Sequence, residues 1–149
     1  MFLRTIVLAV LLSSAFVSAQ TIELPVSLVG KTNKNIFLLT LTVNDRPLRF
    51  IVDTGAEATV VNRDSFARYV QVGRDDRVTT LSGDSALEPI YLELTFGNRK
   101  VSHRAFKTNL DIVNRSAGTR IDGIIGQDFL SMFSSVSFDY KRKLLVLVP

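Results

Sequence analysis

The distribution of apolar residues along the chain predicts a protein built mainly of β-strands. Apolar and polar side chains alternate through residues 21–29, which is the period of a strand with one buried face. Further strands are expected over residues 36–43, 48–52, 59–61, 78–81, 87–96, 100–106, 121–125, 136–140 and 144–148, with Gly, Asn and Asp in several of the turns. Short helices are expected at 65–69 and 127–133, and a loose polar stretch at 107–120. This pattern predicts an all-β, single-lobe barrel with one or two short helices.

Composition narrows the kind of protein and the kind of chemistry. The 149 residues are 46% hydrophobic and 21% charged, which fits one globular core and not two lobes. The absence of Cys excludes disulfides, thiolate catalysis and Cys-ligated zinc. The single histidine, His103, is expected to be an exposed strand residue, so neither a metal nor a cofactor is expected. The net charge of +4 is spread in short groups without a basic, aromatic-interleaved stripe, so no nucleic-acid partner is expected.

The first 19 residues have the features of a signal peptide. Arg4 supplies a positive charge, residues 6–12 form a short apolar region, and small side chains precede Ala19. Cleavage after Ala19 would leave a domain of residues 20–149 with no membrane span, in the periplasm or secreted. An uncleaved membrane anchor is the alternative, and it also places the domain outside the cytoplasm.

Residues 50–56, Phe-Ile-Val-Asp-Thr-Gly-Ala, carry the clearest chemical signal. Three apolar residues drive a strand into the core, and the strand ends at Asp53 and Thr54. An ionised carboxylate at the end of a buried strand is costly unless it is paired or solvated. Gly55 lets the backbone turn sharply and lets a ligand approach closely. Taken alone, the tripeptide is a weak signal, because an Asp-Gly turn between strands is ordinary.

Two other segments strengthen that signal. Residues 121–130, Ile-Asp-Gly-Ile-Ile-Gly-Gln-Asp-Phe-Leu, predict a loop and short helix that can pack beside the Asp53 turn. Between the two segments, a glycine-containing hairpin tip at residues 82–84 is suited to fold over a cleft. In this combination and order the chain resembles the retropepsin-like aspartic proteases, especially their bacterial single-domain members. The resemblance implies a retropepsin-like acid protease barrel.

The resemblance also implies roles for individual residues. Asp53 would be the catalytic carboxylate, Thr54, Gly55 and Ala56 the rest of the active-site loop, Ser82, Gly83 and Asp84 the flap, and Ile124, Ile125 and Gly126 the supporting loop. Aspartic proteases use two close carboxylates that share one proton, because both cannot ionise easily. One carboxylate activates a water and the other polarises the scissile carbonyl, without a metal or cofactor.

The sequence contains one such motif, so the second carboxylate must come from a second chain. No other Asp-Thr-Gly or Asp-Ser-Gly is present, which predicts an isologous homodimer with two facing copies of Asp53. The apolar strand 144–148 would lie either at the subunit interface or inside the barrel. The viral enzymes carry an acidic residue and an Arg that can pair near the site. Glu57 fits the first position, but Gln127 replaces the Arg, so a different dimer geometry is expected there.

Three functions remain open at this point. The first is an aspartic endopeptidase with an acidic optimum that hydrolyses polypeptide substrates. The second is a catalytically weak or inactive retropepsin-like binding or scaffold module. The third is an exported barrel that binds a small ligand and in which Asp53 is only a turn residue.

Overall fold

The computed structural model describes residues 20–32, 35–68, 76–80 and 83–149, with the backbone alone at 76–80 and 83–87. The predicted signal peptide and Ser82 lie outside the described residues. The strands are β1 (Ile22–Val29), β2 (Ile36–Val43), β3 (Arg46–Val52), β4 (Val60–Asn62), β5 (Asp76–Thr80), β6 (Gly83–Phe96), β7 (Arg99–Thr108), β8 (Gly123–Ile125), β9 (Ser135–Asp139) and β10 (Leu144–Val148). The described helices are α1 (Asp111–Ala117) and α2 (Gln127–Leu130), which confirms the mostly-β class.

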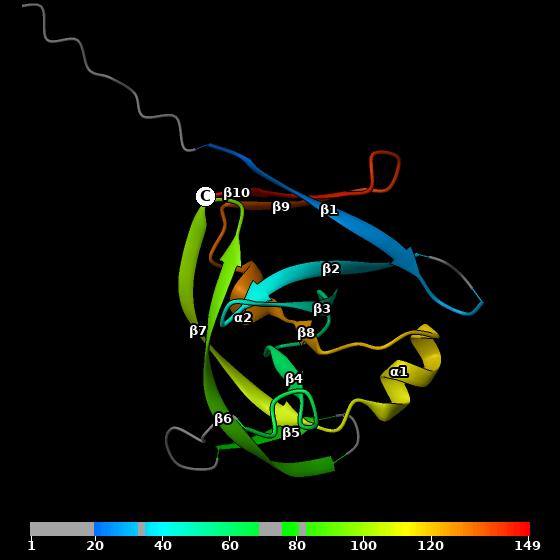
Figure 1. Cartoon of the computed structure of the whole chain (residues 1–149), viewed down its shortest axis with the longest axis vertical. Coiled ribbons are helices and arrows are strands. Elements are labelled where there is room, and N and C mark those ends of the chain that lie inside the picture. The colour runs from blue at the N-terminus through cyan, green and yellow to red at the C-terminus, as the bar shows by residue number, and fades with distance from the viewer. Residues whose placement is uncertain (1–19, 33–34, 69–75, 81–82) are drawn as a thin grey trace, which may run out of the picture.

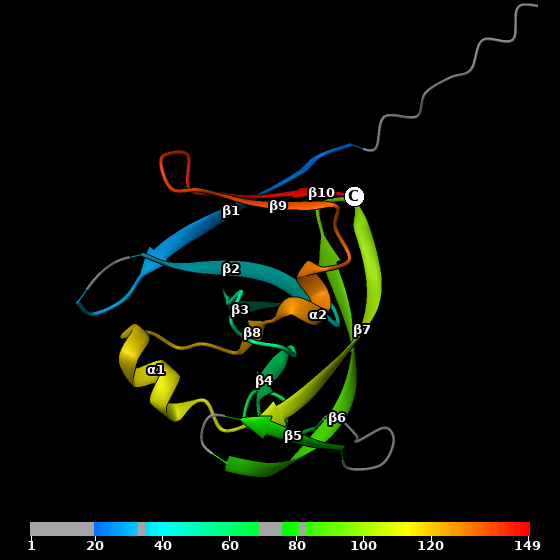
Figure 2. The ribbon, with the colours of Figure 1, turned by 180° about the vertical axis from the view of Figure 1, so that it is seen from behind.

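A closed barrel forms the centre of the molecule. The strands follow the order β5-β6-β7-β4-β8-β3-β2-β1-β10-β9, and β6 pairs additionally with β2. In that pairing Thr42 lies opposite Thr95 and Val43 opposite Leu94. It closes β2, β3, β8, β4, β7 and β6 into a six-stranded barrel, with β3, β8 and β4 near the middle of the views (Figures 1 and 2).

The last hairpin extends the sheet beyond the barrel. β10 pairs with β1 on one side and β9 on the other, so residues 144–148 form an internal strand of the sheet. Leu145 and Leu147 are buried in the main core. The strand therefore lies within the sheet but outside the six-stranded barrel, and its place at a subunit interface stays a prediction. The β5–β6 hairpin lies at the opposite end of the molecule (Figure 1).

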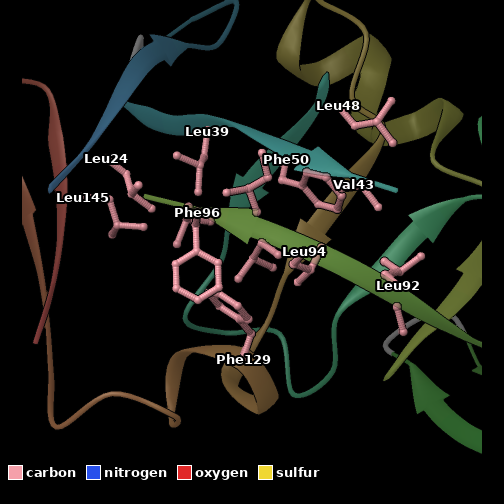
Figure 3. Packing of buried hydrophobic residues seen from close by; sticks show 14 of the residues in the cluster. Leu24, Leu39, Val43, Leu48, Phe50, Leu92, Leu94, Phe96, Phe129 and Leu145 are labelled. Atoms are coloured by element: carbon pink, nitrogen blue, oxygen red, sulfur yellow. The ribbon is translucent and has the colours of Figure 1, made fainter. Parts of the chain in front are cut away.

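Apolar side chains from all around the barrel meet in one main cluster. Phe50 of β3, Phe96 of β6 and Phe129 of α2 point into it together with leucines of several strands (Figure 3). The rings of Phe96 and Phe129 pack edge to face with centroids 5.3 Å apart. Burial of such large side chains is the main favourable term for folding, and here it fixes α2 against the strands.

The strand β3 is buried on both faces, which explains its continuous apolar run. Phe50 and Val52 face the main cluster, whereas Ile51 belongs to a second cluster with Leu38, Leu110, Ala117 and Ile121. The turn before β3 is tighter than expected, because Asn44 and Asp45 have φ values of 47° and 63°. Two consecutive residues at positive φ match the twist of a two-residue hairpin, so β3 starts at Arg46.

The polar stretch 107–120 was predicted to be irregular, and this prediction was wrong. It contains α1, whose first N–H, on Asp111, donates to Asn109 Oδ1 at 2.8 Å. The helix ends at Gly118, with φ of 69° and its N–H bonded to the Asn114 carbonyl. Leu110, Val113 and Ala117 pack on the second cluster. Their spacing of three and four residues was the available signal, hidden by the polar residues between them.

The helix predicted at 65–69 was also wrong. Residues 63–68 form turns, and Tyr69 lies outside the described residues. Here the Asn62 N–H donates to the Asp122 carbonyl and the Arg63 N–H donates to the Thr108 carbonyl, and these bonds hold the backbone in a non-helical path. Neither helix of the described residues is long and apolar enough to cross a bilayer.

Candidate active site

The Asp53 loop is suspended between two strands that share one neighbour. β3 leads into the loop and pairs in parallel with β8, where Val52 lies opposite Ile125. β4 leaves the loop and pairs with the other edge of β8, where Val60 lies opposite Ile124. Residues 53–59 therefore pass over the end of β8, which brings together the two motifs that are 70 residues apart in the sequence.

The backbone of Asp53 is held by hydrogen bonds, whereas its side chain is exposed. Its N–H donates to the Ile125 carbonyl at 3.0 Å, which continues the β3–β8 pairing into the loop. Its Oδ1 accepts the Gly55 N–H at 2.8 Å. Asp53, Thr54 and Gly55 are all exposed. Within the described part of this single chain, no interaction joins the Asp53 carboxylate to a second carboxylate.

The supporting segment makes its closest contacts through glycine. A Cβ on Gly126 would lie 2.6 Å from the Ala58 carbonyl carbon and 2.9 Å from the Ala56 oxygen. Those are backbone atoms of the Asp53 loop, so only glycine lets the loop lie directly on this segment. Ile125 is fully buried, whereas Ile124 is half-buried beside Val60. Gly126 thus lies against the Asp53 loop, and the supporting role of residues 124–126 stays a prediction.

The start of α2 holds the same loop by hydrogen bonds. The Gln127 N–H donates to the Ala56 carbonyl at 2.8 Å, and the Asp128 N–H donates to the Glu57 carbonyl at 3.1 Å. The Gln127 side chain donates from Nε2 to the Thr54 carbonyl at 2.8 Å. Gln127 therefore binds the Asp53 loop of its own chain through both its backbone and its side chain.

Thr59 and Asp128 are site residues that the sequence reasoning missed. The Thr59 N–H lies 2.9 Å from both carboxylate oxygens of Asp128, and its hydroxyl donates to Oδ1 at 2.7 Å. Burial raises the pKa of Asp128, but the hydrogen bonds from His103 and Thr59 outweigh burial and hold the pKa below its usual range. For Asp128, the available signal was an acidic residue in the first turn of a short helix that begins after a glycine.

His103 was predicted to be exposed, and this prediction was wrong. Its residue is 8% exposed, and its Nε2 lies 3.3 Å from Asp128 Oδ2. The alternation of β7 places His103 on the same face as Val101 and Ala105, which points inward. Burial is acceptable there because Asp128 and Thr59 offer polar partners to the ring.

Gly83 and Asp84, which were predicted to lie at the tip of a hairpin, are strand residues of the β5–β6 hairpin. Gly83 and Asp84 belong to β6, where they pair with Thr80 and Thr79 of β5. Ser82 lies outside the described residues. The role of this hairpin over Asp53 stays a prediction.

Asp122, directly before β8, carries a buried carboxylate. Asp122 is 4% exposed and accepts the Arg49 N–H at 3.0 Å, the Ser65 hydroxyl at 2.7 Å and Arg120 Nε at 3.1 Å. Burial raises the pKa of Asp122, but these three donors outweigh it, so the pKa lies below the ordinary value of 3.8. Asp122 therefore stabilises the fold in its ionised form.

Asp122 is expected to make the stability of the fold dependent on acid. A carboxyl with a lowered folded-state pKa contributes stability above its unfolded-state pKa and loses it as the pH falls through the folded-state value. We expect the free energy of unfolding in urea to fall as the pH is lowered from about 4 to 2, and to fall less steeply in Asp122→Asn. Asp45→Asn, in an exposed turn, is the control. An equal pH dependence in wild type and Asp122→Asn would contradict this assignment.

Among the described residues, no group of three or more His, Asp or Glu side chains is arranged to hold a metal ion. The arrangement brings the Asp53 loop, β8 and α2 together around one exposed carboxylate. Such a carboxylate on a rigid loop is suited to acid–base chemistry on a bound water.

Known proteins share both the sequence pattern and the fold. The sequence model of the aspartyl protease family matches residues 39–129, which include the Asp53 loop and Gly126. A retropepsin-like aspartic protease from Rickettsia conorii superposes with a TM-score of 0.56 at 18% identity, over 86% of this chain and 90% of that one. The EIAV protease in complex with an inhibitor superposes at 0.51 and 19% identity, over 70% and 93%. No curated protein matches the sequence. The predicted retropepsin-like barrel is confirmed.

Proposed function

Because the chain belongs to the aspartyl protease family, we propose that it is an aspartic endopeptidase that hydrolyses polypeptides with Asp53 as its catalytic carboxylate. The observation that carries the proposal is the Asp53 loop itself. Its carboxylate is exposed, while its backbone is bonded to Ile125 and clamped by α2. A catalytic group needs this combination of solvent access and fixed geometry.

The proposed active unit is a homodimer. One chain supplies one Asp-Thr-Gly motif, and the proposed chemistry needs two carboxylates. A twofold axis beside the loop would place two copies of Asp53 face to face, and an isologous interface builds that pair from identical surfaces. Asp53, Thr54 and Gly55 are exposed, which is consistent with a partner chain at this surface.

The proposed mechanism is general acid–base hydrolysis. The paired carboxylates share one proton, because two negative charges at short distance repel each other. The ionised carboxylate takes a proton from a water as that water attacks the scissile carbonyl carbon. The protonated carboxylate donates to the carbonyl oxygen, and the resulting tetrahedral species then collapses with protonation of the leaving amine. The predicted flap of residues 82–84 would cover the bound peptide.

Cleavage of a mixed peptide library between about pH 3 and 7, the range in which a shared-proton pair titrates, tests the proposal. We expect cleavage with an acidic optimum, and no cleavage by the Asp53→Asn chain. A wild type that is monomeric and inert over this range would support the alternative of a binding or scaffold module. Cleavage that is unaffected by Asp53→Asn would remove Asp53 from the mechanism.

Dimerisation makes a separate prediction about dilution. If the site forms from two chains, activity per chain falls once the concentration drops below the dimer dissociation constant. We expect specific activity and the sedimenting dimer fraction to fall together on dilution. Constant specific activity in samples that sediment as monomers would contradict a two-chain site.

We also propose that the protein is exported to the periplasm or secreted. The support is the pattern of residues 1–19, with one early positive charge, a short apolar region and small side chains before Ala19.

A further inference from the structure

His103, the only histidine in the sequence, is buried beside Asp128 and Thr59, which hold the end of the Asp53 loop. His103 Nε2 lies 3.3 Å from Asp128 Oδ2 and 3.2 Å from Thr59 Oγ1. The imidazole also packs edge to face on Phe129, with centroids 5.5 Å apart. Three segments of the chain, β7, α2 and the end of the Asp53 loop, therefore meet at this ring.

The hydrogen bonds determine which atoms carry protons. The Thr59 hydroxyl donates to Asp128 Oδ1 at 2.7 Å and accepts the Gly126 N–H at 3.2 Å. Because the Thr59 hydroxyl donates its proton to Asp128, both neighbours of His103 Nε2, the Thr59 hydroxyl oxygen and Asp128 Oδ2, act as acceptors. Nε2 must then carry a hydrogen, which donates to the carboxylate and the hydroxyl oxygen.

Asp128 links His103 to the Asp53 loop by hydrogen bonds. Its carboxylate accepts the Thr59 N–H at 2.9 Å, and its own N–H donates to the Glu57 carbonyl at 3.1 Å. Removal of the His103 donor would leave a partly buried carboxylate with a weaker set of partners, which costs free energy because fewer donors then stabilise the charge. The carboxylate would then turn toward water or take up a proton, and either change releases Thr59.

We propose that His103 is a positioning residue for Asp53: its Nε2–H holds the Asp128 carboxylate in the orientation that fixes the end of the Asp53 loop at Thr59. This inference rests on the proposed function for its effect on catalysis, but the effect on the loop does not need substrate. His103 does not touch the reacting atoms in this arrangement. It acts through Asp128 and Thr59.

The surroundings of the ring identify Asp128 as its ionisable partner. Asp128 of α2 is the titratable group in contact with His103 among the described residues. Thr59 of the loop, Phe129 of α2 and Leu92, its pairing partner on β6, carry no charge.

Two substitutions and a matched control test the inference. His103→Phe keeps the ring volume but lacks the donor, whereas His103→Gln keeps an N–H donor. Val43→Ala removes a buried side chain of β2 that takes no part in this network. We expect His103→Phe to lower kcat about tenfold with KM changed less than twofold, and His103→Gln to restore most of the loss. Val43→Ala is expected to lower stability and leave kcat unchanged. A kcat for His103→Phe equal to that of Val43→Ala would overturn the proposal.

Hydrogen exchange of the Thr59 amide gives a readout without proteolysis. We expect its protection to fall at least tenfold in His103→Phe and to stay high in His103→Gln. If the wild type cleaves no peptide but Thr59 exchange follows this pattern, the proposed function fails and the positioning contact stands. Unchanged Thr59 protection in His103→Phe overturns the positioning contact, whatever the activity.

Discussion

Replacing Asp53 by Asn is expected to lower kcat/KM for peptide cleavage by about 1000-fold or more, because the amide neither accepts the proton of the water nor donates one as an acid. In a homodimer the substitution removes both carboxylates at once. The fold should be unaffected. Asp53 is exposed, and the Asn Oδ1 can accept the Gly55 N–H as the carboxylate does. Peptide cleavage, circular dichroism and urea unfolding on the same sample separate the two effects.

Mixing the Asp53→Asn chain with wild type tests the two-chain site directly. After refolding together at equal amounts, random pairing leaves a quarter of the dimers fully wild type, so activity drops to about half that of wild type refolded alone. Asp64→Asn is the control, since it removes one exposed carboxylate outside the Asp53 loop. Activity that stays constant as inactive chain is added would argue for a site complete within one chain.

The strands and the Asp53 turn were predictable because their signals are local. Alternation in β1 and the continuous apolar run of β3 report directly on which faces are buried. Because β3 is buried on both faces, residues 50–52 are all apolar, so the Asp53 that follows them is easy to recognise in the sequence. The aspartyl protease pattern adds the pairing of this turn with residues 121–126, which no local signal contains.

The clamp on the loop could not be read in the same way. Thr59 and Asp128 become partners only because β8 lies between β3 and β4, which is a property of the strand order. His103 shows the same limit more sharply. Histidine is more often found at the surface than in a core, but the alternation of β7 places His103 on its buried face. The partner that makes its burial acceptable, Asp128, lies 25 residues further along the chain. A polar residue at an inward phase is therefore a reason to look for a buried partner.

Gly126→Ala is expected to have the largest effect on the architecture of the site. The added Cβ would lie 2.6 and 2.7 Å from the carbonyl carbon and oxygen of Ala58, which real Cβ atoms essentially never do. These are backbone atoms with no rotamer to change, so the loop must move away from β8. That movement would strain the bonds from Gln127 N–H to Ala56 and from Gly126 N–H to Thr59. We expect a loss of about 2–3 kcal/mol in the free energy of unfolding, together with most of the activity.

Gly118→Ala separates this steric effect from the general cost of replacing glycine. Gly118 ends α1 at φ of 69°, and its Cβ would meet the flexible side chain of Lys31 at 3.2 Å. It should lower stability by about 1–2 kcal/mol through the left-handed backbone and leave kcat unchanged. Urea unfolding and kcat, measured on both variants well below their unfolding midpoints, give the comparison. If Gly126→Ala lost stability but kept wild-type kcat, the close contact with β8 would serve folding alone. The catalytic geometry would then have to be fixed by α2, through Gln127 and the Asp128 carboxylate.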